Sequence, residues 1–205
     1  MKYFIRQSLY SMGMILVAPL IIPFFLTTEK EIILTDVRRW VELLRWTGQS
    51  DLGNLLSLLN RAKEFRNLYY YRLFKGNLMS RVVMYVLKIF YPECPTLFLD
   101  TSCNIGPGMF LQHGFSTIVM ADIGENCWIN QQVTIGYKDQ NSRPKIGNNV
   151  RITAGAKVIG GITIGNNVTV GANAVVVKNV PDNCVVVGVP AYIVKRNGVK
   201  VKEEL

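Results

Sequence analysis

The chain has 205 residues, 49% of them hydrophobic, and a formal net charge of +9, which suits one extended domain with a smaller accessory region. Its four cysteines lie far apart without a C-x-x-C pair, so we expect reduced thiols, no disulfide framework and no cysteine metal site. The single histidine excludes a zinc site of three histidines, and the lack of a nucleic-acid-binding motif argues against a nucleic-acid partner.

Residues 1–95 carry 13 Lys and Arg against 7 Asp and Glu, which favours a membrane surface or an anionic partner. Residues 9–26 form an uncharged segment of 18 residues that contains Pro19 and Pro23. It can be interpreted as a membrane span, a re-entrant or surface-lying segment, or an arm packed on a partner subunit. No convincing signal-peptide cleavage site follows it. We expect membrane association at the inner, cytoplasmic face, because the basic residues follow the segment.

Three helical segments are expected next, at residues 36–47, 51–75 and 78–90. Tyr69, Tyr70 and Tyr71 lie in the second of them, between basic residues. Such a cluster can lie at a lipid headgroup layer, but it is more often a packing face against the repeat domain. No catalytic motif is found in residues 1–95, which we take as the first region.

From residue 96 to about 190 the sequence repeats with a six-residue period. Aliphatic residues recur at every sixth position, with Thr117 at one of them; the series is Leu99, Ile105, Leu111, Ile123, Ile129, Ile135, Ile146, Ile152, Val158, Ile164, Val170 and Val176. This period fits short strands joined by tight turns, which predicts a mainly β fold, a parallel β-solenoid. The 11-residue step after Ile135 predicts a loop at 137–145, and residues 191–205 are expected to be a basic tail.

The repeats resemble a known family. Leu111-Gln-His-Gly, Thr134-Ile-Gly, Arg143-Pro-Lys-Ile-Gly, Ala154-Gly-Ala-Lys and Gly188-Val-Pro-Ala are similar to motifs of hexapeptide-repeat acyltransferases, in the serine acetyltransferase branch. The resemblance covers about residues 97–195. It implies a left-handed parallel β-helix with three hexapeptides per coil, a homotrimer, and acetyl-CoA bound between adjacent subunits.

Coil arithmetic stacks His113 with Gln131, Ala154 and Ala172 over about 14 Å. The resemblance implies that His113 is the general base and that Ala154 and Ala172 contact coenzyme A. It implies the same of Gly136. Lys195 and Arg196 are assigned to the phosphate end of the cofactor, from their charge alone. No metal is expected.

Two residues differ from the serine acetyltransferase pattern. Gln112 stands where those enzymes have an aspartate, and Arg143 stands where they have a second histidine. Without a carboxylate at position 112 for the ammonium group of serine, we expect Gln112 and Arg143 to bind a carbohydrate hydroxyl instead. The predicted function is therefore O-acetylation of a capsular, exopolysaccharide or O-antigen glycan. Serine O-acetyltransferase and a non-catalytic, trimeric, membrane-associated scaffold are the alternatives, and a longer acyl donor stays open.

Overall fold

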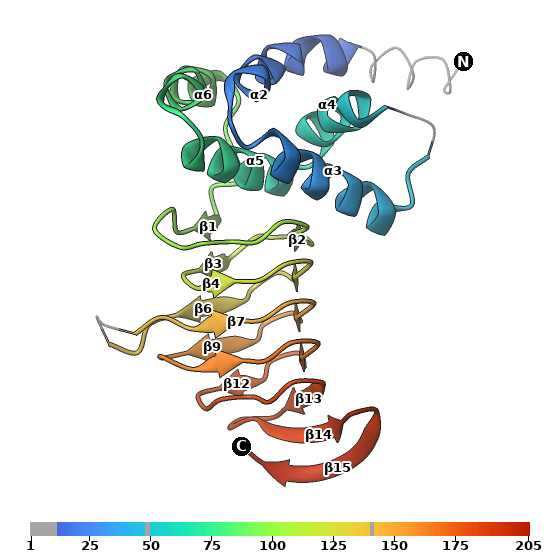
Figure 1. Cartoon of the computed structure of the whole chain (residues 1–205), viewed down its shortest axis with the longest axis vertical. Coiled ribbons are helices and arrows are strands. Elements are labelled where there is room, and N and C mark those ends of the chain that lie inside the picture. Colours follow the sequence, from blue (N-terminus) through green and yellow to red (C-terminus); the bar gives the residue numbers. More distant parts are fainter. Residues whose placement is uncertain (1–11, 48–49, 140–141) are drawn as a thin grey trace. The chain divides into compact units, whose positions relative to one another are not determined.

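The computed structural model describes residues 12–47, 50–139 and 142–205 (Figure 1). The chain divides into two compact units, residues 1–94 and residues 95–205. The first is helical and the second is a β-helix. We describe each unit separately.

Within its described residues, the helical unit begins with helical residues 12–17 and continues with the 3₁₀ helix η1 (Ala18–Ile21). The α-helices that follow are α2 (Ile22–Leu26), α3 (Lys30–Leu44), α4 (Asp51–Arg61), α5 (Lys63–Lys75) and α6 (Leu78–Phe90). The bounds of α6 agree with the predicted helix 78–90. The predicted helix 51–75 is two helices, because Ala62 takes an extended conformation between α4 and α5. Side chains cap two of the helices: Ser50 accepts from the Gly53 amide at α4, and Asn77 accepts from the Ser80 amide at α6.

Helix α5 forms the centre of this unit. Tyr69, Tyr70 and Tyr71 are all buried, so the interpretation of the tyrosines as a headgroup layer is wrong. The Tyr69 hydroxyl donates to the Leu20 carbonyl, 2.7 Å away. Arg72 on α5 is also buried, and its Nε lies 2.8 Å from Oδ2 of Asp36 on α3. The chemistry of this region is therefore that of a packed core with one buried ion pair.

The segment predicted at residues 9–26 lies partly outside the described residues, which begin at residue 12. In its described part the helix changes to 3₁₀ geometry at η1, and the prolines Pro19 and Pro23 stand near the starts of η1 and α2. Across the described residues, we find no helix with the length and apolarity that membrane crossing requires.

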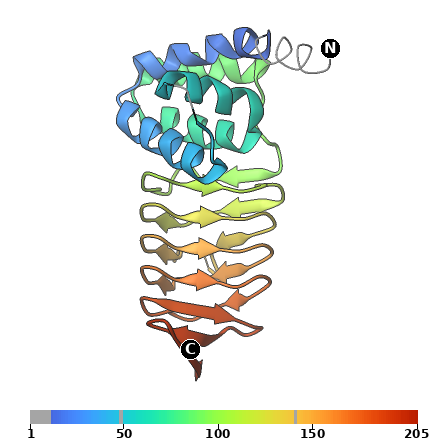
Figure 2. The ribbon, with the colours of Figure 1, turned by 90° about the vertical axis from the view of Figure 1, so that its right-hand side faces the viewer.

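The β-helix unit consists of short strands in three sheets (Figures 1 and 2). The first sheet holds β1 (Leu97–Leu99), β3 (Thr117–Val119), β6 (Thr134–Gly136), β9 (Lys157–Ile159) and β12 (Val175–Val176). The second holds β4 (Asp122–Ile123), β7 (Lys145–Ile146) and β10 (Thr163–Ile164). The third begins with β2 (Phe110–Leu111), β5 (Trp128–Ile129), β8 (Arg151–Ile152) and β11 (Thr169–Val170). These strands pair in parallel, so each coil adds one strand to each sheet, as the six-residue period predicted.

The repeated aliphatic residues point inward and the repeated asparagines form the corners. Ile135, Val158 and Val176 stack in the first sheet and are fully buried. Asn149 and Asn167 have left-handed backbones, with φ of 56° for both, which asparagine tolerates better than most residues. The Asn149 side-chain amide donates to Asn167 Oδ1 at 3.2 Å in the next coil. These ladders explain why the sequence between the aliphatic positions is rich in Asn.

Two corners are longer than the regular repeat. The loop predicted at 137–145 is present between β6 and β7 and projects from the β-helix (Figure 1). The second departure was missed: Leu111 pairs with Ile129, but Val119 pairs with Ile135. The corner between β2 and β3 is therefore two residues longer than the matching corner of the next coil. The prediction that Thr117 occupies the repeat position is wrong, because Val119 occupies it.

The last coil is followed by an antiparallel hairpin rather than the predicted tail. Strand β13 (Cys184–Val187) belongs to the third sheet, and β14 (Tyr192–Arg196) and β15 (Val199–Glu204) extend that sheet. Val and Lys alternate in residues 199–202, which is the two-residue period expected of a β-strand.

Candidate functional site

His113 lies in the enlarged corner between β2 and β3. Two residues of this corner, His113 and Ser116, have left-handed backbones with φ of 54° and 52°. The Phe115 amide donates to the His113 carbonyl at 2.6 Å, which closes a tight turn inside the corner. His113 and Phe115 are exposed. The single imidazole is therefore presented to solvent by an irregular turn on a rigid scaffold, an arrangement that is frequent at functional sites.

The column predicted from the repeat is present for Gln131, Ala154 and Ala172 but not for His113. Leu111, Ile129, Ile152 and Val170 are successive partners in the third sheet, so the corners of the upper coils stack above each other. In the enlarged first corner the Gln132 amide donates to the Phe115 carbonyl at 3.0 Å, so Phe115 takes the position that the regular repeat gave to His113, and His113 lies two residues before it. The corners stay in register because the Gly155 amide donates to the Gln131 carbonyl and the Asn173 amide donates to the Ala154 carbonyl, both at 3.0 Å. The side chains of this column are small above Gln131, at Ala154 and Ala172. We call the line of residues from His113 past Gln131, Ala154 and Ala172 the track.

The side-chain amides of Gln112 and Gln131 differ in their hydrogen bonding. Gln112 Oε1 accepts from Trp128 Nε1 at 3.1 Å and from Asn130 Nδ2 at 2.9 Å, which fixes its orientation. Gln131 Oε1 is buried and has no hydrogen-bond partner among the described residues. A buried amide oxygen without a partner is destabilising. The sequence prediction included Gln131 in the column but gave it no role.

Arg143 lies at a different edge of the β-helix, just before β7. Its Nη1 is 3.4 Å from Ser102 Oγ and 3.2 Å from Cys103 Sγ, and its Nε is 3.7 Å from Asp122 Oδ2. The hydrogen bond to Cys103 and the nearby carboxylate of Asp122 raise the pKa of Arg143. Burial raises the pKa of the Cys103 thiol, and the carboxylate of Asp100 adds to that shift. This edge therefore combines one guanidinium with two carboxylates.

A pocket of about 470 Å³ opens beside this group, lined in part by Asp122, Tyr137, Arg143 and Lys145. Its lining is mostly polar and carries both signs of charge. Such a pocket suits a small ligand with its own positive and negative groups.

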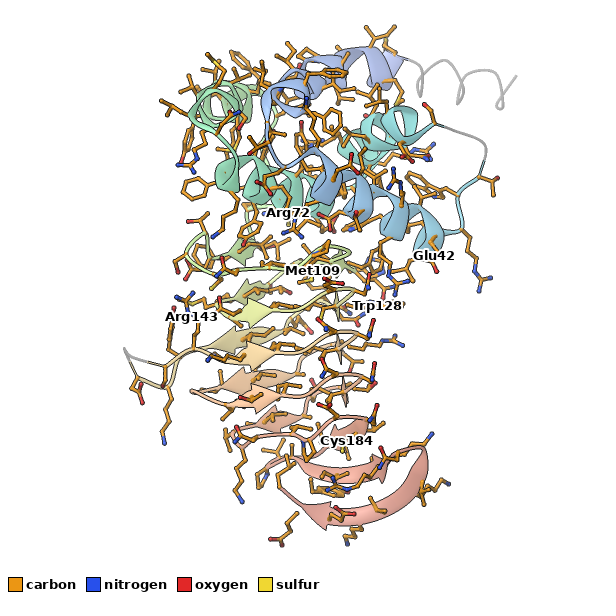
Figure 3. The ribbon with its side chains drawn as sticks, viewed as in Figure 1. Glu42, Arg72, Met109, Trp128, Arg143 and Cys184 are labelled. Atoms are coloured by element: carbon orange, nitrogen blue, oxygen red, sulfur yellow. The ribbon has the colours of Figure 1, made fainter. Side chains whose placement is uncertain are left out.

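Within one chain, the structure separates the predicted site residues into two sets. His113 and Gln112 follow a strand of the third sheet, whereas Arg143 and Gly136 flank the loop between the first and second sheets. Figure 3 shows Trp128, the partner of Gln112, and Arg143 on opposite sides of the β-helix. A single chain therefore does not bring Arg143 to His113.

The two basic residues assigned to the cofactor phosphates lie on β14. Lys195 is exposed and pairs in register with Val185 of the third sheet. Arg196 is paired with Glu203 of β15, with its Nε 3.0 Å from Oε2. In this structure the guanidinium is thus bound to a carboxylate, and Lys195 is the more accessible cation. No cluster of three or more metal-ligating side chains is found in the described part of the chain.

Part of the β-helix matches a known family of repeats. Residues 143–178 match the family described as bacterial transferase hexapeptide, six repeats. The match is similar in kind to the resemblance found in the sequence, and it lies within the β-helix unit.

Among curated proteins, a serine acetyltransferase of Synechococcus elongatus is 43% identical over 108 residues, or 50% of this chain and 44% of that protein. A serine acetyltransferase of Staphylococcus aureus strain Mu50 is 47% identical over 108 residues, or 50% of this chain and 51% of that protein. The chain thus spans about half the length of the curated relatives it matches.

Among solved structures, Neisseria gonorrhoeae serine acetyltransferase in complex with serine is similar, with a TM-score of 0.64 and 29% identity. The match covers 82% of this chain and 69% of that one. The β-helix unit is only slightly more than half of the chain, so the match includes much of the helical unit.

These findings overturn the prediction of a polysaccharide O-acetyltransferase. The matched relatives and structures are serine acetyltransferases, which was the alternative interpretation. The prediction considered a carboxylate only at position 112. The structure also has carboxylates near Arg143, at Asp100 and Asp122.

Proposed function

We propose that this protein is an acetyl-CoA-dependent serine O-acetyltransferase that works as a homotrimer. The observation that carries the proposal is the exposed His113 at the start of a track of small residues, on a β-helix whose relatives are named serine acetyltransferases. Serine acetyltransferases use acetyl-CoA as the acyl donor, and the track from His113 past Gln131, Ala154 and Ala172 suits the long, thin shape of coenzyme A.

In the proposed reaction His113 is the general base. Its imidazole takes the proton of the serine hydroxyl while that oxygen attacks the thioester carbonyl. The carbon–sulfur bond then breaks, and the imidazolium returns the proton to the departing thiolate of coenzyme A. Backbone amides would stabilise the oxyanion that forms in between. Since no nucleophilic side chain is needed, the acetyl group passes directly from donor to acceptor.

The acceptor site is completed by the adjacent subunit in this proposal. Hexapeptide-repeat proteins are typically trimers, and a groove between two subunits can combine the His113 corner of one with the Arg143 edge of the other. Arg143 is suited to bind the carboxylate of serine through its planar guanidinium, and Asp122 or Asp100 can bind the ammonium group. This arrangement removes the need for a carboxylate at Gln112.

Acceptor analogues test this assignment. For Arg143→Ala we expect KM for L-serine to rise about 10- to 100-fold, because a charge-assisted, bidentate interaction is lost. Ethanolamine has the hydroxyl and ammonium of serine but lacks the carboxylate, so its KM should be nearly unchanged by the substitution. Arg143→Lys is the matched control, since it keeps the charge and loses the planar fork.

The rates are measured as free thiol released from acetyl-CoA. An equal effect of Arg143→Ala on L-serine and ethanolamine would contradict the assignment of Arg143. Failure of every small hydroxy-amine acceptor, with turnover on a glycan, would contradict serine as the acceptor class.

A further inference from the structure

Two segments of the helical unit expose large apolar side chains. One is residues 12–26, which include η1 and α2, and the other is α6. The most exposed of these side chains, at 61–76% exposure, are Ile15, Leu16, Leu78, Met79, Ile89 and Phe90. We call the exposed apolar side chains of these two segments the apolar face. Large exposed apolar patches on a protein usually mark a surface that binds a partner or a membrane.

The two segments lie side by side, so the apolar face is continuous. The Asn77 side-chain amide donates to the Leu26 carbonyl at 2.7 Å, at the start of α6. The Tyr91 hydroxyl donates to the Leu16 carbonyl at 2.8 Å, at the end of α6. These two hydrogen bonds tie the segments together in antiparallel order. Figures 1 and 2 both show α6 beside the N-terminal segment.

The charge of the apolar face has one sign. Residues 12–28 contain no charged side chain, and α6 contains only Arg81 and Lys88. Lys88 lies at the border of the face, where it pairs with Glu93, and Arg81 stacks over the Phe74 ring with its Cζ 5.0 Å from the centroid. Because Glu93 neutralises Lys88, Arg81 is the cation of α6 that can attract a partner. The two segments of a second copy contain no carboxylate for Arg81. An anionic lipid surface would attract this cation and accept the apolar side chains.

The length of α6 determines whether it can span a lipid bilayer or only lie on its surface. Its 13 residues correspond to about 20 Å of helix, which is shorter than the roughly 30 Å core of a bilayer. A short amphipathic helix lies in the plane of the headgroups, with its apolar side chains reaching the acyl boundary.

We propose that the apolar face binds the surface of an anionic lipid membrane without crossing it. The helical unit then has a role beyond the acetyl transfer of the β-helix, because it localises the enzyme. With acetyl-CoA as donor, the expected surface is the inner face of the cell membrane. Residues 1–95 carry a net charge of +6, which adds long-range attraction to that surface.

Vesicle sedimentation with the full-length protein tests the proposal. The probes are vesicles of phosphatidylcholine with about one third phosphatidylglycerol, compared with pure phosphatidylcholine. We expect binding to the anionic vesicles, and at least tenfold weaker binding for Val86→Asp/Ile89→Asp, since two exposed apolar contacts are replaced by charge. Leu44→Asp/Leu52→Asp is the matched control, because both residues are exposed on α3 and α4 outside the apolar face. The control should bind as the unsubstituted protein does.

Light scattering after size-exclusion chromatography separates the competing explanation. If Val86→Asp/Ile89→Asp lowers the molar mass of the assembly, the apolar face is a contact between copies and the membrane proposal is wrong. Equal binding by the two double variants, or no binding to anionic vesicles, would also overturn it. Acetyl transfer without vesicles should be the same in both variants, which keeps this test independent of the proposed function.

Discussion

Subunit mixing is the prediction that follows most specifically from the separation of His113 and Arg143. His113→Ala and Arg143→Ala each disable a different side of the proposed groove. When the two variants assemble into one trimer, some grooves combine the intact His113 of one chain with the intact Arg143 of another. Two impaired enzymes should thus produce an active one.

The expected recovery follows from the symmetry of a ring of three. Any trimer that contains both variants, in either ratio, has one groove with both residues intact, one with neither, and one with a single residue. Mixed trimers should therefore have about one third of the activity of the unsubstituted trimer. The comparison is made at L-serine concentrations below KM, where the rate reports kcat/KM.

The assay uses co-expression of the two variants with different affinity tags, followed by purification on both tags in succession. Thiol release from acetyl-CoA with L-serine is then measured per trimer. Co-expressed His113→Ala and His113→Asn, purified in the same way, serve as the control, because none of their grooves holds a histidine. If the His113→Ala and Arg143→Ala mixture stays as low as this control, the groove between subunits is refuted.

Three further predictions concern the track and the two cores. Ala172→Leu should raise KM for acetyl-CoA at least tenfold, because its longer side chain fills the exposed track, whereas Ala172→Ser should leave KM nearly unchanged. Burial raises the pKa of the Cys127 thiol to about 11, so the native state loses stability as the pH rises from 9 to 11. Relative to Cys127→Ala, the free energy of unfolding should fall by about 2 kcal/mol between pH 8 and pH 11, measured by denaturant titration. Asp36→Asn should cost the helical unit about 3–5 kcal/mol, measured by circular dichroism, because Arg72 stays buried without its counter-charge; Asp36→Leu/Arg72→Leu should recover most of that loss.

The repeat was predictable because each coil buries one aliphatic residue per strand. That regularity is visible in the sequence, and it correctly placed Gln131, Ala154 and Ala172 in one column. The corner at His113 was not predictable in the same way. Leu111 and Ile123 are 12 residues apart, which equals two regular six-residue repeats. In the structure the first step, from Leu111 to Val119, has eight residues, and the second, from Val119 to Ile123, has four. The longer first step and the shorter second step cancel, so the sequence spacing does not reveal the enlarged corner.

The separation of the site residues could have been found from the sequence. Asp122 and Arg143 both stand shortly before repeat residues of the same sheet, Ile123 and Ile146, which places them near each other. The prediction instead compared Gln112 and Arg143 with a family pattern, residue by residue. That comparison identified the substitutions but not the carboxylates that accompany Arg143.

In the helical unit, amphipathic patterns predicted the presence of helices but not their packing. The tyrosines of α5 are adjacent in the sequence, so they point to different sides of the helix. All of them are buried because α5 is surrounded by other helices of this unit. A sequence pattern cannot show how many sides of a helix are covered.

The proposed reaction and the role of His113 are tested most directly by the acetylation of L-serine by the purified protein and by His113→Ala. Release of free thiol from acetyl-CoA gives the rate, and mass spectrometry identifies the acetylated product. We predict turnover that depends on L-serine and yields O-acetyl-L-serine. The rate should be about 10²- to 10⁴-fold lower in His113→Ala. Turnover of L-serine that does not change in His113→Ala would contradict the role of His113, and no turnover with L-serine would contradict the proposed reaction.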